Sequence, residues 1–186
     1  MLIGQPASQP AVYNEGAFMI PEINKILYAT DLSANARFAF GYAASLANRY
    51  SAQITILHVL EELSPTTLLL IGDIVGEKRL SSLRSDKEQE IIASIQKRLK
   101  DFTASFCRET PQCPISVNQI IVETGHPVSR IIATADEIDA DIIVMGSHGQ
   151  GMLEQVVIGS TSRRVLRRCK KPVLVVRLPE NGQPDQ

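Results

Sequence analysis

Two glycine-containing segments lie in the C-terminal half of the chain at a short, defined spacing. Residues 146–149 read Gly-Ser-His-Gly, and residues 159–161 read Gly-Ser-Thr after an interval of nine residues. Glycine lets main-chain N–H groups approach a ligand closely, and the second segment precedes a predicted helix, whose N-terminus attracts anions. The spacing predicts a loop that wraps a ribose and its phosphates, with Ser160 and Thr161 as hydroxyl donors. The alternative is a tight turn followed by an ordinary helix cap.

Two better-known phosphate-binding motifs do not fit these glycines. A Walker A loop needs Gly-Lys followed by Ser or Thr, and no such sequence occurs in the chain. The dinucleotide fingerprint follows the first strand of its domain, whereas these glycines follow the fourth predicted strand.

Other side chains could take part in the chemistry of such a site. Asp31 follows the first predicted strand, where it could cap a helix together with Ser33, accept hydrogen bonds from a ribose or help to hold Mg²⁺. His148 lies within the glycine loop and could polarise a phosphate or act as a base. Because no second base, carboxylate pair or metal cluster accompanies it in the sequence, we predict a residue near the ligand and no catalytic residue. His58 and His126 are predicted to serve their local structure.

The elements that would position these residues alternate between strand and helix. Apolar runs predict strands at 25–30, 53–59, 115–122, 141–145 and 172–176, and helical spacing predicts helices at 34–50, 85–108, 127–138 and 159–169. This alternation indicates an α/β fold with a single doubly wound parallel sheet and right-handed crossovers. Ligands of such sheets bind beyond the carboxyl ends of the strands, where the strand order reverses. We therefore expect the first and fourth strands to flank a crevice.

The rest of the chain divides into extensions and one long connection. We predict an N-terminal arm at 1–22, a nucleotide-binding domain at 23–178 and a C-terminal tail at 179–186. Inside the domain, residues 61–84 form a long connection, which is either a helix packed on the surface or a flap or dimer contact.

Composition excludes several classes of protein. The net charge is −1, with 19 basic and 20 acidic residues, which argues against a domain that binds nucleic acid by neutralising phosphates. No segment reaches the roughly 18 apolar residues of a membrane span, and the N-terminus does not resemble a signal peptide. The three cysteines show no CxxC pair, so we predict neither a disulfide framework nor a zinc site. We expect a cytoplasmic protein without nucleic-acid or membrane partners.

The glycine pattern also resembles that of a known family. Gly146, Gly149, Gly159 and Ser160 form Gly-x2-Gly-x9-Gly-Ser/Thr, which is similar to the ATP-binding branch of the universal stress protein family. Matching segments extend from about residue 24 to 178 and read KILYATDLS, ITILHVLEE, ETGHPVSRII, DADIIVMGSHGQG and RRVLRRCKKPVLVV. The arm and the long connection depart from the family pattern.

The resemblance implies a fold, a ligand and a partner. The fold is a Rossmann-like sheet of five parallel strands in the order 3-2-1-4-5, of the adenine nucleotide alpha hydrolase-like type. The ligand is ATP with Mg²⁺, and the partner is a second copy of the chain, paired through Val173, Leu174, Val175 and Val176. Matched residue by residue, the nucleotide would be held by Thr30 and Asp31 beside the adenosine, the backbone of Val59 at adenine, Met145 and Gly146 at the ribose, and Gly149, Gly159, Ser160 and Thr161 at the phosphates.

The resulting prediction is an ATP-binding regulatory dimer of the stress response. It would hold ATP without cleaving it, because no arginine finger or catalytic base is evident in the sequence. Three alternatives stay open. They are a slow ATPase or autophosphorylating protein using Ser147, Ser160 or Thr161, a binder of AMP or cyclic AMP, and a dimeric scaffold without nucleotide.

Overall fold

The computed structural model describes residues 20–62, 77–149 and 158–177. The predicted C-terminal tail, and residues 1–19 of the predicted arm, lie outside the described residues. The same holds for residues 63–76 of the predicted connection and for residues 150–157 between the two glycine segments.

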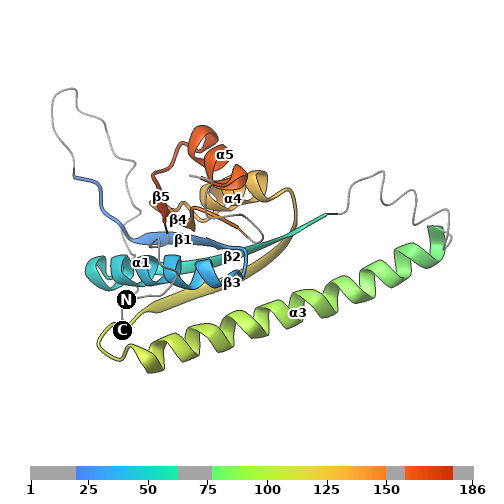
Figure 1. Cartoon of the computed structure of the whole chain (residues 1–186), viewed down its shortest axis with the longest axis horizontal. Coiled ribbons are helices and arrows are strands. Elements are labelled where there is room, and N and C mark those ends of the chain that lie inside the picture. Colours follow the sequence, from blue (N-terminus) through green and yellow to red (C-terminus); the bar gives the residue numbers. More distant parts are fainter. Residues whose placement is uncertain (1–19, 63–76, 150–157, 178–186) are drawn as a thin grey trace, which may run out of the picture.

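Five parallel strands form one sheet. They are β1 (Lys25–Thr30), β2 (Gln53–Glu61), β3 (Ser116–Gly125), β4 (Ile142–Gly146) and β5 (Val173–Val176). Their order is β3-β2-β1-β4-β5 (Figure 1), and β1 pairs in parallel with both β2 and β4. The predicted fold class and strand order are therefore confirmed, and the order reverses between β1 and β4.

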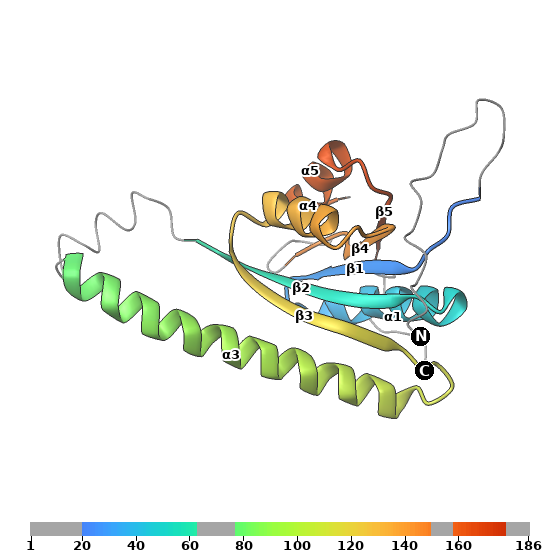
Figure 2. The ribbon, with the colours of Figure 1, turned by 180° about the vertical axis from the view of Figure 1, so that it is seen from behind.

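Helices cover both faces of the sheet. One face carries α1 (Ala34–Tyr50) and α3 (Glu77–Glu109), and the other carries α4 (Pro127–Glu137) and α5 (Ser160–Arg168), as Figures 1 and 2 show from opposite sides. Right-handed crossovers produce this division, because the chain moves outward from β1 in one direction and then returns to build the sheet in the other.

The core has two halves that follow the alternation of side chains along each strand. Ile26, Tyr28, Ile54 and Ile56 of β1 and β2 pack under α1 and α3. The intervening residues Leu27, Ala29 and Leu57 pack under α4 and α5, where they join Val128, Ile131 and Val165. Both faces of the central strands are buried, which is why these strands are almost continuously apolar.

Aromatic rings attach α3 to the rest of the domain. Phe40 of α1 lies with its ring centroid 5.0 Å from that of Phe102 and 4.9 Å from that of Phe106, both in edge-on arrangements. Leu99 is 2% exposed in the same half of the core. Ile91, which was predicted on this face, is 48% exposed, and among the α3 residues whose side chains are described, Ile95 is the first that packs against this half of the core.

Most predicted boundaries agree with the structure, and the largest difference lies in the long connection. β1 and α1 have the predicted bounds, whereas α3 begins at Glu77 rather than at Ser85 and β2 continues to Glu61. Residues 77–84 of the predicted connection therefore belong to α3, and its first residue, Glu61, is the last residue of β2. Residues 77–84 read EKRLSSLR and are mostly good helix formers without a clear apolar repeat. Hydrophobic periodicity therefore did not predict that the helix extends over them.

Two predictions from composition can be compared with the described residues. None of the described helices is long and apolar enough to cross a membrane. Cys107, Cys113 and Cys169 are all free thiols, as the absence of a disulfide pattern predicted.

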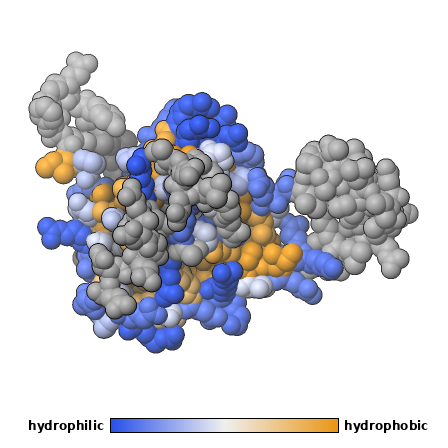
Figure 3. Space-filling model, in the orientation of Figure 1, coloured by the Kyte–Doolittle hydropathy of each residue, from blue (hydrophilic) through white to orange (hydrophobic). Residues whose placement is uncertain are grey.

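The outer side of α5 carries exposed arginines and forms a hydrophilic surface at its end of the molecule (Figure 3).

Candidate functional site

The loops that follow β1 and β4 meet where the strand order reverses. A Cβ atom added to Gly149 would lie 3.2 Å from Oδ2 of Asp31, so the main chain of the β4 loop packs closely against the carboxylate that follows β1. This contact brings the two loops together beyond the carboxyl ends of β1 and β4, the region where we expected a ligand to bind.

The turn after β1 is held by its own side chains. Oγ1 of Thr30 accepts a hydrogen bond from the amide of Leu32 (3.1 Å), and Oδ1 of Asp31 accepts one from the amide of Ser33 (3.0 Å). Between them Leu32 has a φ of 63°, a conformation that is uncommon for a non-glycine residue and concentrates at functional sites. Two side-chain bonds therefore fix a strained turn that presents Asp31 toward Gly149.

Ser33, not Asp31, caps α1. Its Oγ accepts a hydrogen bond from the amide of Ala36 (3.3 Å), and its backbone is extended. The carboxylate of Asp31 instead supports the turn and faces the β4 loop. Of the roles that the sequence left open for Asp31, capping of α1 is therefore wrong.

His58 supports the same turn from the neighbouring strand. His58 lies opposite Thr30 in the β1–β2 register, and its Nδ1 is 2.8 Å from the carbonyl oxygen of Thr30. A carbonyl can only accept, so Nδ1 carries the proton and donates. The predicted local structural role of His58 is confirmed.

Two hydrogen bonds tie the end of β4 to the start of α5. The amide of Gly159 donates to the carbonyl of Ser147 (2.7 Å), and Oγ of Ser162 donates to the carbonyl of Gly146 (2.8 Å). Ser147 is also anchored to β5, because its amide donates to the carbonyl of Val176 (2.7 Å). The two glycine segments are thus brought together, as their spacing predicted.

Sequence reasoning missed the part that Ser147 and Ser162 play in this clamp. Both are buried, with exposures of 2% and 4%. Ser162 sits in the first turn of α5, where serine is common for many reasons, so its type and position alone do not reveal a bond to Gly146.

The clamp decides which amides of α5 face outward. The amide of Gly159, the N-cap residue, is used by Ser147. The amides of Ser160, Thr161 and Ser162 come next, and first-turn amides have no partner within their own helix. The first turn of α5 contains no acidic residue, so its positive dipole end is not offset by a carboxylate of that turn.

His148 is held beside the clamp. Its Nδ1 lies 2.8 Å from Oγ of Ser147, and its side chain is half-buried. The bond involves Nδ1, so Nε2 is the ring nitrogen that remains directed away from Ser147.

The side chains of Met145 and Val59 belong to the core. Met145 is 5% exposed and packs in the half of the core that lies under α4 and α5, and Val59 packs against the same cluster. A ligand contact of Met145 would therefore come from its main-chain atoms, whereas Val59 is only partly buried and its main-chain contact with adenine stays a prediction.

No protein-built metal centre is present in the described part of the chain. Within residues 20–62, 77–149 and 158–177, no group of three or more His, Cys, Asp and Glu side chains could hold a metal ion. A divalent cation at this crevice would therefore rely chiefly on its ligand, with Asp31 as the nearest carboxylate in the β1 turn.

Comparison with known proteins identifies relatives over most of the chain. The model of the universal stress protein family matches residues 22–177. Universal stress protein YxiE of Bacillus subtilis is 31% identical over 155 residues, which cover 83% of this chain and 99% of that protein. Universal stress protein MJ0577 of Methanocaldococcus jannaschii is 29% identical over 153 residues, which cover 82% and 94%.

Solved structures agree at the level of the fold. The structure of MJ0577 has a TM-score of 0.68 at 24% identity and covers 86% of this chain and 99% of its own. Universal stress protein UspA from Lactobacillus plantarum has a TM-score of 0.60 at 25% identity, with 85% and 100% covered. A universal stress protein in complex with cAMP has a TM-score of 0.54 at 20% identity, with 84% and 98% covered. Because the family model spans most of the sequence, the chain belongs to the universal stress protein family.

Proposed function

We propose that the crevice between the β1 and β4 loops binds ATP, and that nucleotide occupancy regulates a dimer of this protein during stress. The observation that carries the proposal is the clamp of Gly159 on Ser147 and of Ser162 on Gly146. It holds a glycine loop beside the N-terminus of α5, so close main-chain approach and a positive helix end occur at one place.

The geometry suggests how the nucleotide would be divided among these residues. Phosphates would accept from the amides and hydroxyls of Ser160 and Thr161, with Gly149 allowing close approach. Gly159 would contribute the shape of the turn, because its own amide is bonded to Ser147. The helix end would contribute about 0.3–1 kcal/mol for an exposed anion.

The sugar and base would lie toward β1 and β2. Asp31 lies against Gly149 where the β1 and β4 loops meet, and its carboxylate would accept from ribose hydroxyls there. Thr30 lies at the end of β1, and the main chain of Val59 lies one strand further along. Gly146 and the main chain of Met145 would border the ribose from β4.

The arrangement favours holding a nucleotide over turning it over. Nδ1 of His148 is bonded to Ser147, and one oxygen of Asp31 is bonded to the amide of Ser33. Nδ1 of His148 and Oδ1 of Asp31 therefore support the loops and would not act as bases. Mg²⁺ would arrive with the phosphates. Slow hydrolysis or phosphorylation of Ser160 or Thr161 would have to use Nε2 of His148 or Oδ2 of Asp31 as the base.

An adenosine monophosphate is the second candidate ligand. One universal stress protein of the same fold has been solved in complex with cAMP. The contacts proposed for adenosine are shared by both ligands, and only the fit of the phosphates at α5 would separate them.

The dimer would form along the outer edge of β5. The amide of Ile143 donates to the carbonyl of Pro172, and that of Ser147 donates to the carbonyl of Val176. Because N–H and C=O of one strand residue point to the same side, the main-chain groups of Val173 and Val175 face away from β4. A sheet edge of this kind is a template for pairing with a second strand.

The proposal is tested by identifying the nucleotide that accompanies the purified protein. The protein is prepared without added nucleotide and denatured, and the released molecule is identified by mass spectrometry. We expect ATP, and its loss in a Ser160→Ala and Thr161→Ala double variant that remains folded. Recovery of AMP or cAMP would favour the second candidate. An empty protein that also fails to bind added ATP with Mg²⁺ would refute nucleotide binding.

A further inference from the structure

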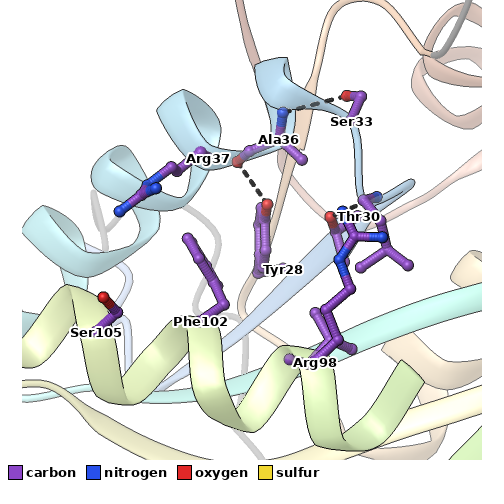
Figure 4. Close-up of a pocket in the computed structure, with 10 residues that line it drawn as sticks. Tyr28, Thr30, Ser33, Ala36, Arg37, Arg98, Phe102 and Ser105 are labelled. Carbon is purple, nitrogen blue, oxygen red and sulfur yellow. Dashed lines mark hydrogen bonds between the residues drawn. The ribbon is translucent and has the colours of Figure 1, made fainter. Parts of the chain in front are cut away.

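A second hollow lies between α1 and α3, on the face of the sheet opposite α5 (Figure 4). Its volume is about 460 Å³, within the roughly 300–1,000 Å³ typical of small-molecule sites. Tyr28, Leu99 and Phe102 supply its apolar lining, and Thr30 lies at the end of β1 beside it. The hollow therefore adjoins the nucleotide crevice at Thr30 but opens on the other side of the sheet.

At one end of this hollow, the charge of Arg37 is paired within the protein. The guanidinium of Arg37 donates to both carboxylate oxygens of Glu109 (3.2 and 3.1 Å) and lies 5.6 Å from the centroid of the Phe102 ring. Oγ of Ser105 donates to the same carboxylate (3.1 Å). Glu109 thus compensates the charge of Arg37 and fixes its side chain as a wall of the hollow.

The other end carries Arg98, an exposed residue whose positive charge is not paired with a carboxylate of the described residues. Among the residues that the structure describes, no ion-pair or hydrogen-bond partner faces the guanidinium of Arg98. Figure 4 shows its side chain rising from α3 toward Thr30, with Phe102 between it and Arg37. Ser33, on the same side, accepts from the amide of Ala36, which leaves its own O–H able to donate.

We propose that this hollow binds a small aromatic carboxylate, with its carboxylate at Arg98 and Ser33 and its ring against Phe102. A guanidinium binds a carboxylate through two parallel charge-assisted hydrogen bonds. A single uncompensated arginine balances one negative charge, which favours a monoanion over the multiply charged phosphates of a nucleotide. The ring of Phe102 offers the apolar surface against which a second ring packs edge-on or offset.

The probe for this site is 2-naphthoate, titrated calorimetrically into the full-length protein. We expect saturable binding that weakens at least about tenfold in Arg98→Gln, because a charge-assisted pair is lost. Arg108→Gln removes an exposed arginine from the same helix without touching the hollow, and it should leave the affinity within about twofold. The neutral 2-naphthamide should bind weakly to the wild type and be insensitive to Arg98→Gln.

The location of the probe is read from amide chemical shifts in the same samples. The proposal predicts perturbations at Leu32, Ser33 and Phe102. It is overturned if 2-naphthoate does not bind at millimolar concentration, or if Arg98→Gln and Arg108→Gln weaken it equally. It is also overturned if the shifts occur instead at 146–149 and 160–162, which would place the probe in the nucleotide crevice.

Discussion

The amide of Gly159 donates a 2.7 Å hydrogen bond to the carbonyl of Ser147, and so closes the segment between β4 and α5 on itself. Both ends of that segment are fixed to the sheet, because Ser147 is bonded to Val176 of β5 and Gly146 to Ser162 of α5. The N-terminus of α5, the proposed phosphate site, is therefore bonded directly to the end of β4. Changes to the clamp should alter nucleotide affinity without touching a nucleotide-facing group.

Ser162→Ala tests the clamp. The variant leaves the carbonyl of Gly146 without its donor, so we expect the free energy of unfolding to fall by about 1 kcal/mol and ATP affinity to fall several-fold. The control is Ser129→Ala, an exposed serine near the start of α4, which should change stability by less than about 0.5 kcal/mol. Urea denaturation and calorimetry measure the two effects. Unchanged ATP affinity in Ser162→Ala would show that the clamp does not position the site.

Ser33→Ala tests the cap of α1. Loss of the bond to the amide of Ala36 should lower the free energy of unfolding by roughly 0.5–2 kcal/mol. Ser33→Asp keeps an acceptor at the same position and should retain most of the stability. Equal loss in both variants would mean that the serine stabilises the turn through something other than capping.

Tyr28 predicts a dependence of stability on alkaline pH. Its hydroxyl donates to the carbonyl of Ala36 (2.5 Å), and burial raises its pKa well above the ordinary value. The folded state therefore keeps the proton while the unfolded state loses it, so stability is fully present below pH about 10 and declines as pH rises further. The limiting slope from this one group is about 1.4 kcal/mol per pH unit.

The comparison variant is Tyr28→Phe, which removes the titrating group. Other residues also titrate in this range, so the informative quantity is the difference between the two proteins in urea midpoint at pH 8 and pH 10.5. The wild type should lose more stability than Tyr28→Phe as the pH rises from 8 to 10.5. A constant difference would show that the hydroxyl is exposed to solvent in the folded protein.

Val175→Pro tests the proposed dimer edge. Proline removes the N–H that faces away from β4, while the ladder bonds of Pro172 and Val176 to β4 remain. We expect a dimer in the wild type by sedimentation equilibrium and a weaker dimer in Val175→Pro. Val175→Thr retains the N–H in a β-branched residue and should behave as the wild type. A monomeric wild type would refute pairing through β5.

Much of the fold follows from local sequence signals. The bounds of β1 and α1 could be predicted because Asp31 and Ser33 mark the turn between an apolar run and a helical repeat. The order of the strands came from the resemblance to a family and not from periodicity, because periodicity does not say which strands are neighbours. Residues 77–84 could not be assigned to α3, because their sequence EKRLSSLR shows no clear apolar repeat.

The candidate site was predicted in its glycines but not in its supports. The proximity of the two glycine segments followed from their short spacing between the fourth predicted strand and the helix that follows it. The roles of Ser147 and Ser162 depend on hydrogen bonds between residues that are distant in sequence and that only the folded chain brings together. The hollow beside Arg98 depends on how α1 and α3 diverge, which no sequence pattern encodes.

ATP binding at the β1 and β4 loops is tested by titrating ATP with Mg²⁺ into nucleotide-free protein carrying Gly149→Val. A side chain at this position meets Oδ2 of Asp31, whereas a Cβ at Gly41 meets no atom within 4 Å, so Gly41→Ala is the matched control. We expect Gly149→Val to weaken ATP binding at least about tenfold and Gly41→Ala to bind as the wild type does. Wild-type affinity in Gly149→Val would refute the proposed site, because ATP could not then lie beside these two loops.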